Sequence, residues 1–162
     1  WVPVDILLIA IGFQLRIFAG GEIADAPISK WLVLMIFLGA LMLSMVKLRS
    51  DFQTYLQLGK KLPKRLQPYD PAFSSYAIVF LAGIATVAYI MYTISEEVLA
   101  RIGHEEIYFS NLFMIMGMMR YLQLSLLDGK GGKPSELFVR DPFLIVMVLG
   151  WIMTFGVLLY LV

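Results

Sequence analysis

The chain of 162 residues alternates five long apolar runs with shorter polar connections. The hydrocarbon core of a bilayer is about 30 Å thick, and a helix needs about 20 mostly apolar residues to cross it. The pattern therefore predicts five membrane-spanning helices in a single transmembrane domain that covers residues 1–162. Their expected bounds are approximately 2–20, 31–47, 73–95, 107–127 and 142–162.

The second apolar run, residues 31–47, is short for a span, but polar residues at its two ends can be part of the same membrane-spanning helix. Ser29, which follows Pro27, can cap the start of this helix by accepting a backbone hydrogen bond. Lys47 can lie at the other end because a long basic side chain keeps its charged head in water while its stem covers apolar surface. The run therefore still qualifies as a span.

Composition supports a membrane protein and excludes several classes of site. Sixty per cent of the residues are hydrophobic, against roughly 45–50% in soluble domains, which excludes a water-soluble monomer. The chain has no cysteine and one histidine, His104, so disulfides, thiolate nucleophiles and His or Cys metal clusters are excluded. The formal net charge of +1 gives no reason to expect a nucleic-acid partner. The expected surroundings are a lipid bilayer.

The charged residues of the loops alternate between the two sides of the membrane. Residues 47–72 hold six Lys and Arg against two Asp, and residues 128–141 hold three more basic residues. The connection 96–106 holds four Glu and one Arg. Because loops rich in Lys and Arg stay in the cytoplasm, the first two segments are predicted to be cytoplasmic and the third to lie outside.

Two arginines lie within predicted spans. Arg120 is about 12 Å from the cytoplasmic end of its helix at a rise of about 1.5 Å per residue, and a central Arg costs at least about 2.5–3.5 kcal/mol. Either it binds a phosphate in a water-filled cleft, which we favour, or it has a structural role, in which it snorkels to the membrane surface or pairs with a buried carboxylate. For Arg16 we favour a structural role. Asp5 lies about 16 Å away along the same helix, so it could be the partner of Arg16 only if the helix tilted or a water chain intervened.

The segment 47–72 contains the strongest candidate chemistry. If the second helix continues, Lys47 and Asp51 share one face of it, and Arg49 is turned away by about 160°. A cation and an acid at the mouth of a membrane cleft suit a phosphate ligand that carries Mg²⁺. The basic residues that follow need only orient the protein and meet anionic headgroups; they are Lys60, Lys61, Lys64 and Arg65.

Five sequence blocks carry a resemblance that runs almost from end to end. They are D-I-L-L-I-A-I-G-F-Q-L-R-I-F-A-G at 5–20, S-K-W at 29–31, K-L-R-S-D at 47–51, R-Y-L at 120–122, and P-S-E-L-F-V-R-D-P-F-L with a following Trp151 in 134–151. The chain resembles the UbiA-type intramembrane prenyltransferase superfamily. The K-L-R-S-D and R-Y-L blocks narrow the resemblance to the decaprenyl-phosphate phosphoribosyltransferase branch.

The resemblance implies an all-α integral membrane fold of which these are the C-terminal five helices in a nine-helix bundle. It implies a cleft that faces the cytoplasm of a prokaryotic cell, and a first Asn/Asp-rich motif that would precede residue 1, so we expect this portion alone to be inactive. The second acidic motif corresponds to 47–51. There the branch commonly has Lys-Arg followed by Glu, whereas this chain has Leu48 in the Arg position and Asp51 in the Glu position.

The acids of this motif help to choose between branches of the superfamily. Prenyl transfer to an aromatic ring calls for a second motif with two closely spaced Asp, but the next acid after Asp51 is Asp70. Basic residues around one carboxylate better suit a donor and an acceptor that are both polyanions. We therefore expect transfer of 5-phosphoribose from phosphoribosyl diphosphate to a polyprenyl phosphate, with release of diphosphate and with Mg²⁺ as cofactor.

The expected roles follow from this reading. Asp51 and Lys47 are the candidate catalytic residues, and Asp51 is the candidate metal ligand. The candidate substrate-binding residues are Arg49, Arg120, Tyr69 and Arg16. Two alternatives stay open: a UbiA-type enzyme that uses a prenyl diphosphate and an aromatic acceptor, and a non-enzymatic transporter or scaffold, which Gly or Pro breaks at mid-membrane depth would support. The sequence also leaves open whether the protein forms a homo-oligomer.

Overall fold

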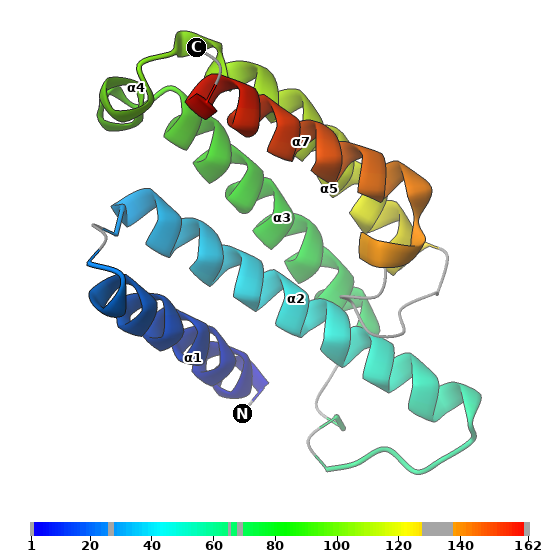
Figure 1. The fold of residues 1–162 in the computed structure, drawn as a ribbon. Coiled ribbons are helices and arrows are strands. Elements are labelled where there is room, and N and C mark those ends of the chain that lie inside the picture. Colours follow the sequence, from blue (N-terminus) through cyan, green and yellow to red (C-terminus); the bar gives the residue numbers. More distant parts are fainter. Residues whose placement is uncertain (1, 26–27, 65, 68–69, 128–137, 161–162) are drawn as a thin grey trace.

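The computed structural model describes residues 2–25, 28–64, 66–67, 70–127 and 138–160, and every regular element within these ranges is helical (Figure 1). The elements in chain order are α1 (Val2–Ile23), α2 (Lys30–Gln57), α3 (Pro71–Thr93), the short α4 (Glu96–Ile102), the 3₁₀ helix η1 (Glu105–Phe109), α5 (Ser110–Leu126) and α7 (Pro142–Tyr160). The fold class is that of an all-α membrane protein.

Three of the five expected spans are full-length apolar helices. Val4–Ile23 of α1, the whole of α2 and the whole of α3 are long and apolar enough to cross a membrane. Helix α5 has 17 residues, and the described apolar part of α7 ends at Leu158. The fourth expected span, 107–127, is shorter than predicted because its first residues belong to η1.

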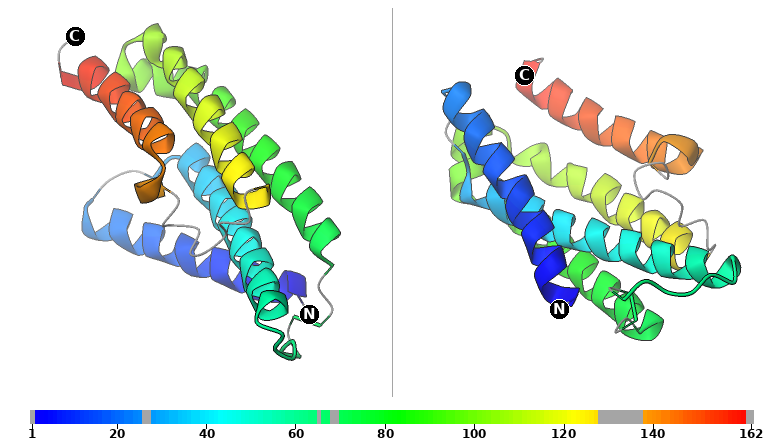
Figure 2. Two further views of the ribbon diagram at one scale, coloured as in Figure 1. Left: turned by 90° about the vertical axis from the view of Figure 1, so that its right-hand side faces the viewer. Right: turned by 90° about the horizontal axis from the view of Figure 1, so that it is seen from below.

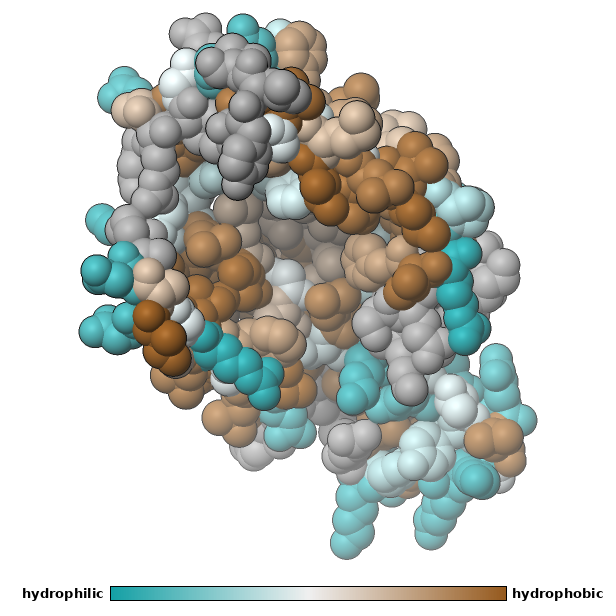
Figure 3. All heavy atoms as spheres, viewed as in Figure 1, coloured by the Kyte–Doolittle hydropathy of each residue, from teal (hydrophilic) through white to brown (hydrophobic). Residues whose placement is uncertain are grey.

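The long helices form an antiparallel series in which each packs on the next. Helix α1 packs on α2, α2 on α3, α3 on α5, and α5 on α7. Figure 2 shows α1 and α7 as the two ends of this arc, and the face drawn in Figure 3 is hollowed between them. The start of α1, the end of α2, the start of α3, the end of α5 and the start of α7 lie at the same end of the antiparallel series (Figure 1). We call this end of the molecule the site end.

Side chains from α1, α2, α3, α5 and α7 meet in one apolar core. Helix α3 presents Ala82, Ala85 and Ala88 to its neighbours, and small residues let helix backbones approach closely in a membrane. The main cluster of buried residues consists of Ile6, Met42, Met45, Val46, Ile78, Ala82, Tyr121, Leu124 and Leu144. This core holds the site end of α2 in place.

The ends of α2 are set by local hydrogen bonds. The Ser29 side chain accepts a hydrogen bond from the Trp31 N–H, which confirms the predicted cap. The helix then continues ten residues past the expected end at Lys47, because polar residues after Lys47 end the apolar run without breaking the helix. It stops at Gly59, whose φ of 61° suits glycine, with the Lys60 N–H bonded to the Tyr55 carbonyl.

Candidate functional site

A polar hollow of about 100 Å³ lies between α1 and α2 at the site end. Its charged lining consists of Asp5 from α1 and Lys47 and Asp51 from α2. The remaining lining residues are Ile6, Ile9, Ser44 and Leu48. The hollow therefore combines one cation, two carboxylates and an apolar wall within a membrane-spanning bundle.

The continuation of α2 is what brings Lys47 and Asp51 together. They are four residues apart, and residues at this spacing share a helix face. Both line the hollow as the sequence spacing predicts. Asp5 is the functional candidate that the sequence analysis missed, because it was weighed there only as a partner for Arg16. Asp5 faces α2 because α1 packs on α2. The spacing of residues within one helix cannot predict which residues of another helix it will face.

Arg49 does not line the hollow with Lys47 and Asp51, and its substrate-binding role stays a prediction. Its Nη1 donates to the Ser125 carbonyl at 2.9 Å, and its Nη2 donates to the Leu126 carbonyl at 3.2 Å. These carbonyls belong to the last turn of α5, where a guanidinium both completes hydrogen bonds and complements the helix dipole. Arg49 lies against α5 because the spacing of two residues turns it to the side of α2 opposite Lys47, as the sequence predicts.

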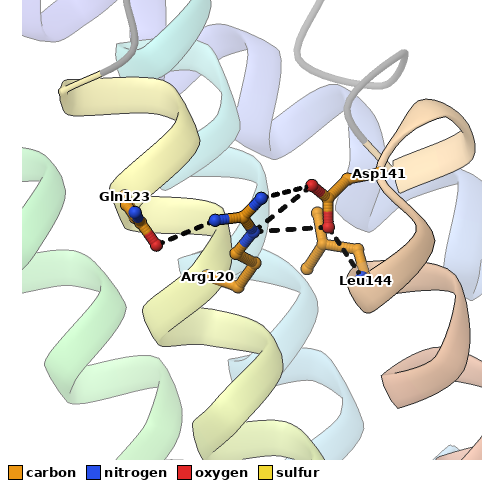
Figure 4. Close-up of polar contacts among 4 residues, drawn as sticks. All are labelled: Arg120, Gln123, Asp141 and Leu144. Atoms are coloured by element: carbon orange, nitrogen blue, oxygen red, sulfur yellow. Dashed lines mark hydrogen bonds and ion pairs between the residues drawn. The ribbon is translucent and has the colours of Figure 1, made fainter.

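Arg120 forms the ionic pair that the sequence analysis held as the alternative to phosphate binding (Figure 4). Its Nη2 donates to Asp141 Oδ2 at 2.7 Å, its Nε is 3.3 Å from both carboxylate oxygens, and its Nη1 donates to Gln123 Oε1 at 3.0 Å. The Arg120 side chain is 31% exposed and the Asp141 side chain is 11% exposed. The phosphate role of Arg120 stays a prediction, and it would require Asp141 to share the guanidinium.

Asp141 also begins α7. Its Oδ1 accepts the Leu144 N–H at 3.0 Å, as an N-cap carboxylate does, and Pro142 occupies the first helical position. The Arg120 guanidinium beside it holds the pKa of Asp141 below its ordinary value of 3.8, and the Leu144 N–H acts in the same direction. The carboxylate is therefore charged at neutral pH and ties α5 to α7.

Arg16, another candidate substrate-binding residue, does not line the hollow. Arg16 is exposed on α1, and its guanidinium lies 5.5 Å from the centroid of the Phe13 ring, a cation–π contact. Eleven residues separate it from Asp5, which is about 16 Å of helical rise. Tyr69 lies outside the described residues.

The donor set of the hollow fits a magnesium ion that arrives with a phosphorylated ligand. Mg²⁺ is commonly held by one or two carboxylates together with substrate phosphates and water, and Asp5 and Asp51 supply two carboxylates on one hollow. In the parts of the chain that the structure describes, no group of three or more potential metal-binding side chains occurs. A ligand phosphate would therefore have to complete the coordination.

A second hollow, of about 200 Å³, is apolar and lies among α2, α5 and α7. The Tyr121 hydroxyl in its lining is buried and has no hydrogen-bond partner among the described residues. The other lining residues are Met42, Phe113, Met114, Gly117, Met118, Phe138, Leu144, Met147, Val148 and Trp151. Methionine side chains adapt to irregular apolar ligands, so this lining suits a flexible hydrocarbon chain.

Comparison with known proteins supports the resemblance drawn from the sequence. No protein-family model matches the chain. Over a 162-residue alignment it is 27% identical to the decaprenyl-phosphate phosphoribosyltransferase of Mycolicibacterium smegmatis, with 96% of this chain and 51% of that protein covered. The corresponding protein of Corynebacterium glutamicum is 25% identical, with 98% and 47% covered.

The protein of the same name from Mycobacterium tuberculosis is 23% identical, with 94% of this chain and 49% of that protein covered. These matches confirm the similarity to the decaprenyl-phosphate phosphoribosyltransferase branch. The chain spans about half the length of the curated relatives it matches.

Proposed function

We propose that the protein transfers 5-phosphoribose from phosphoribosyl diphosphate to a polyprenyl phosphate, with release of diphosphate. The observation that carries the proposal is the hollow between α1 and α2, where Lys47 lies with Asp5 and Asp51 at one end of a membrane-spanning helix. The names of the relatives support the same reaction. The basic loops favour a hollow that faces the cytoplasm of a prokaryotic cell.

The proposed reaction is a substitution at the anomeric carbon of the donor. The bond from this carbon to the diphosphate oxygen breaks, and the leaving diphosphate keeps the electron pair. A phosphate oxygen of the lipid forms the new bond to the same carbon, which gives polyprenyl-phosphoryl-5-phosphoribose. Since both reactants are polyanions, the protein contributes mainly by positioning them and by compensating negative charge.

The residues of the hollow have complementary parts in this scheme. Lys47 binds and neutralises a phosphate oxygen as a compact cation. Asp51 and Asp5 would hold Mg²⁺, which when bound neutralises charge on the leaving diphosphate. Ile6, Ile9 and Leu48 form the apolar part of the wall. A partly apolar wall lowers the local dielectric constant and strengthens each of these electrostatic contacts.

The acceptor needs a place for its hydrocarbon chain as well as its phosphate. The apolar hollow among α2, α5 and α7 matches a segment of such a chain in its volume and its lining. Met42 of α2 lines this hollow, and Lys47, just over one turn later in α2, lines the polar one. We propose that the polyprenyl chain occupies the apolar hollow while its phosphate reaches Lys47.

The test is transfer of radiolabelled ribose phosphate from the water-soluble donor into an organic-soluble polyprenyl phosphate by the full-length protein. We expect Mg²⁺-dependent transfer by the wild type. Asp51→Asn should lower the rate by at least about a hundredfold, which is typical when a charge-stabilising group is removed. The matched control is Asp25→Asn, because Asp25 is exposed at the opposite end of α1 and should leave the rate unchanged.

Two outcomes would overturn the proposal. One is a wild-type protein that transfers no label to any polyprenyl phosphate but joins a prenyl diphosphate to an aromatic acceptor. The other is an Asp51→Asn variant with the rate of the wild type, which would remove the hollow from the chemistry.

A further inference from the structure

We infer that the end of α2 and the turn after it form a binding surface for anionic phospholipid headgroups. We call this surface the lysine ledge; it consists of Leu56, Leu58, Lys60, Lys61 and Lys64. The inference is independent of the proposed reaction, because it concerns the outside of the bundle and uses none of the residues assigned to the hollow.

The length of α2 puts the lysine ledge at the depth of the headgroups. Its 28 residues span about 42 Å, whereas the hydrocarbon core is about 30 Å thick. If Lys30 marks one edge of that core, the other edge falls about 20 residues later, near Ser50. The last turns of α2 then project by about 10 Å, and Figure 1 shows α2 extending beyond its neighbours at this end.

The exposed side chains of the ledge have the mixed character of a membrane-surface segment. Leu56 and Leu58 are 57% and 60% exposed, and Lys60, Lys61 and Lys64 are exposed beside them. Apolar side chains next to lysines are the composition that binds interfaces rich in anionic lipid. Figure 3 shows hydrophilic residues gathered at this end of the molecule.

Among the residues that the structure describes, no acidic group is ion-paired with the three lysines. The sequence from 52 to 69 contains no Asp or Glu. The two acids that border the segment are used elsewhere: Asp51 lines the polar hollow, and Asp70 caps α3 by accepting the Ala72 N–H at 2.8 Å. The exposed lysines of the ledge are therefore accessible to an external anion.

The chain is anchored on both sides of the three lysines. At Gly59 the chain leaves α2 in a left-handed turn closed by hydrogen bonds from the Gly59 and Lys60 N–H groups. A few residues later Leu66 is fully buried, which returns the chain to the bundle. Because both ends are fixed, binding a headgroup costs less conformational entropy than it would in a free loop.

The test compares lipid binding by the full-length protein in detergent. Native mass spectrometry would count bound short-chain phosphatidylglycerol and phosphatidylcholine for the wild type and for a triple variant with Lys60→Gln, Lys61→Gln and Lys64→Gln. At about fivefold per lysine, the triple variant should lose about a hundredfold in affinity for phosphatidylglycerol and nothing for phosphatidylcholine. High salt should weaken the wild-type preference.

Two further variants make the result specific. Lys30→Gln removes an exposed lysine from the opposite end of α2 and should keep the preference. A triple Lys→Arg variant keeps the charge and should therefore also keep the preference for phosphatidylglycerol. A triple Gln variant with an unchanged preference, an equal loss in Lys30→Gln, or displacement of phosphatidylglycerol from the ledge by inorganic diphosphate would overturn the inference, the last in favour of a substrate site.

Discussion

Arg49 and Asp51 are two residues apart, yet they act at different places. Asp51 lines the hollow between α1 and α2, while Arg49 binds the last carbonyls of α5. The 3.6-residue period predicts this separation once the helix is known to continue. The helical period does not show which other helix each face contacts. For this reason the sequence does not predict that Asp51 lies near Asp5 of α1 or that Arg49 binds the end of α5.

Arg120 and Asp141 provide a prediction that separates packing from phosphate binding. The structure pairs the two side chains across α5 and α7, so Arg120→Met should lower the melting temperature by several degrees because it leaves the Asp141 carboxylate without its cation. Arg120→Lys keeps the charge and should preserve most of the stability and the transfer rate. Thermal unfolding and transfer should be measured on both variants. A stable Arg120→Lys protein with strongly reduced transfer would support the phosphate role instead.

The same pair predicts a dependence of stability on acid pH. Since the Arg120 guanidinium lowers the pKa of Asp141 in the folded protein, the pair contributes fully above the ordinary pKa of about 3.8. Its contribution is lost as the pH falls below that value and through the lowered pKa of the folded state. Asp141→Asn should remove this part of the acid dependence, while Asp25→Asn should keep it. Equal acid profiles for wild type and Asp141→Asn would contradict the assignment.

At the scale of the elements, α5 and α7 are held together by close packing as well as by charge. A Cβ atom at Gly150 would lie 2.4 to 2.9 Å from three carbons of the Phe113 ring, so the ring occupies the place of a side chain. This close approach is part of the packing between α5 and α7. A hydropathy pattern cannot predict such a contact. It shows that a helix is apolar enough to lie in the membrane, but it does not show which residues of two helices touch.

Gly150→Ala should therefore destabilise the protein by about 1–3 kcal/mol, the usual cost of overpacking. The control is Gly156→Ala in the same helix, where nothing lies within 4 Å of the added Cβ. Alanine there should be neutral or stabilising by up to about 1 kcal/mol. Unfolding in detergent measures both, and combining Gly150→Ala with Phe113→Leu should recover part of the loss. Equal stability of the two alanine variants would contradict the packing.

For the whole molecule, the hydropathy pattern predicts the helical class and the place of each long helix. It places the end of α2 ten residues too early, because Asp51, Gln53 and Gln57 resemble a loop in polarity although they continue the helix. It also places the start of α5 too early, where η1 comes first. The antiparallel arc puts the end of α2 and the start of α7 at one end (Figure 1), as the alternating loop charges require.

The orientation of the arc can be measured by cysteine labelling, since the chain has no cysteine of its own. Lys61 and Glu106 are both exposed and lie in connections predicted to be on opposite sides. An impermeant maleimide added to intact cells should label Glu106→Cys, and it should label Lys61→Cys only after the membrane is permeabilised. Labelling of Lys61→Cys in intact cells would reverse the proposed orientation.

The most direct test of the account is whether the hollow between α1 and α2 binds a divalent cation together with the donor. Mn²⁺ takes the same oxygen ligands as Mg²⁺, and its binding to the full-length protein can be followed by electron paramagnetic resonance with phosphoribosyl diphosphate present. We predict that Asp51→Asn and Asp5→Asn each weaken Mn²⁺ binding by at least about tenfold, while Asp25→Asn does not. Folded Asp51→Asn and Asp5→Asn proteins that bind Mn²⁺ as tightly as the wild type would contradict the account.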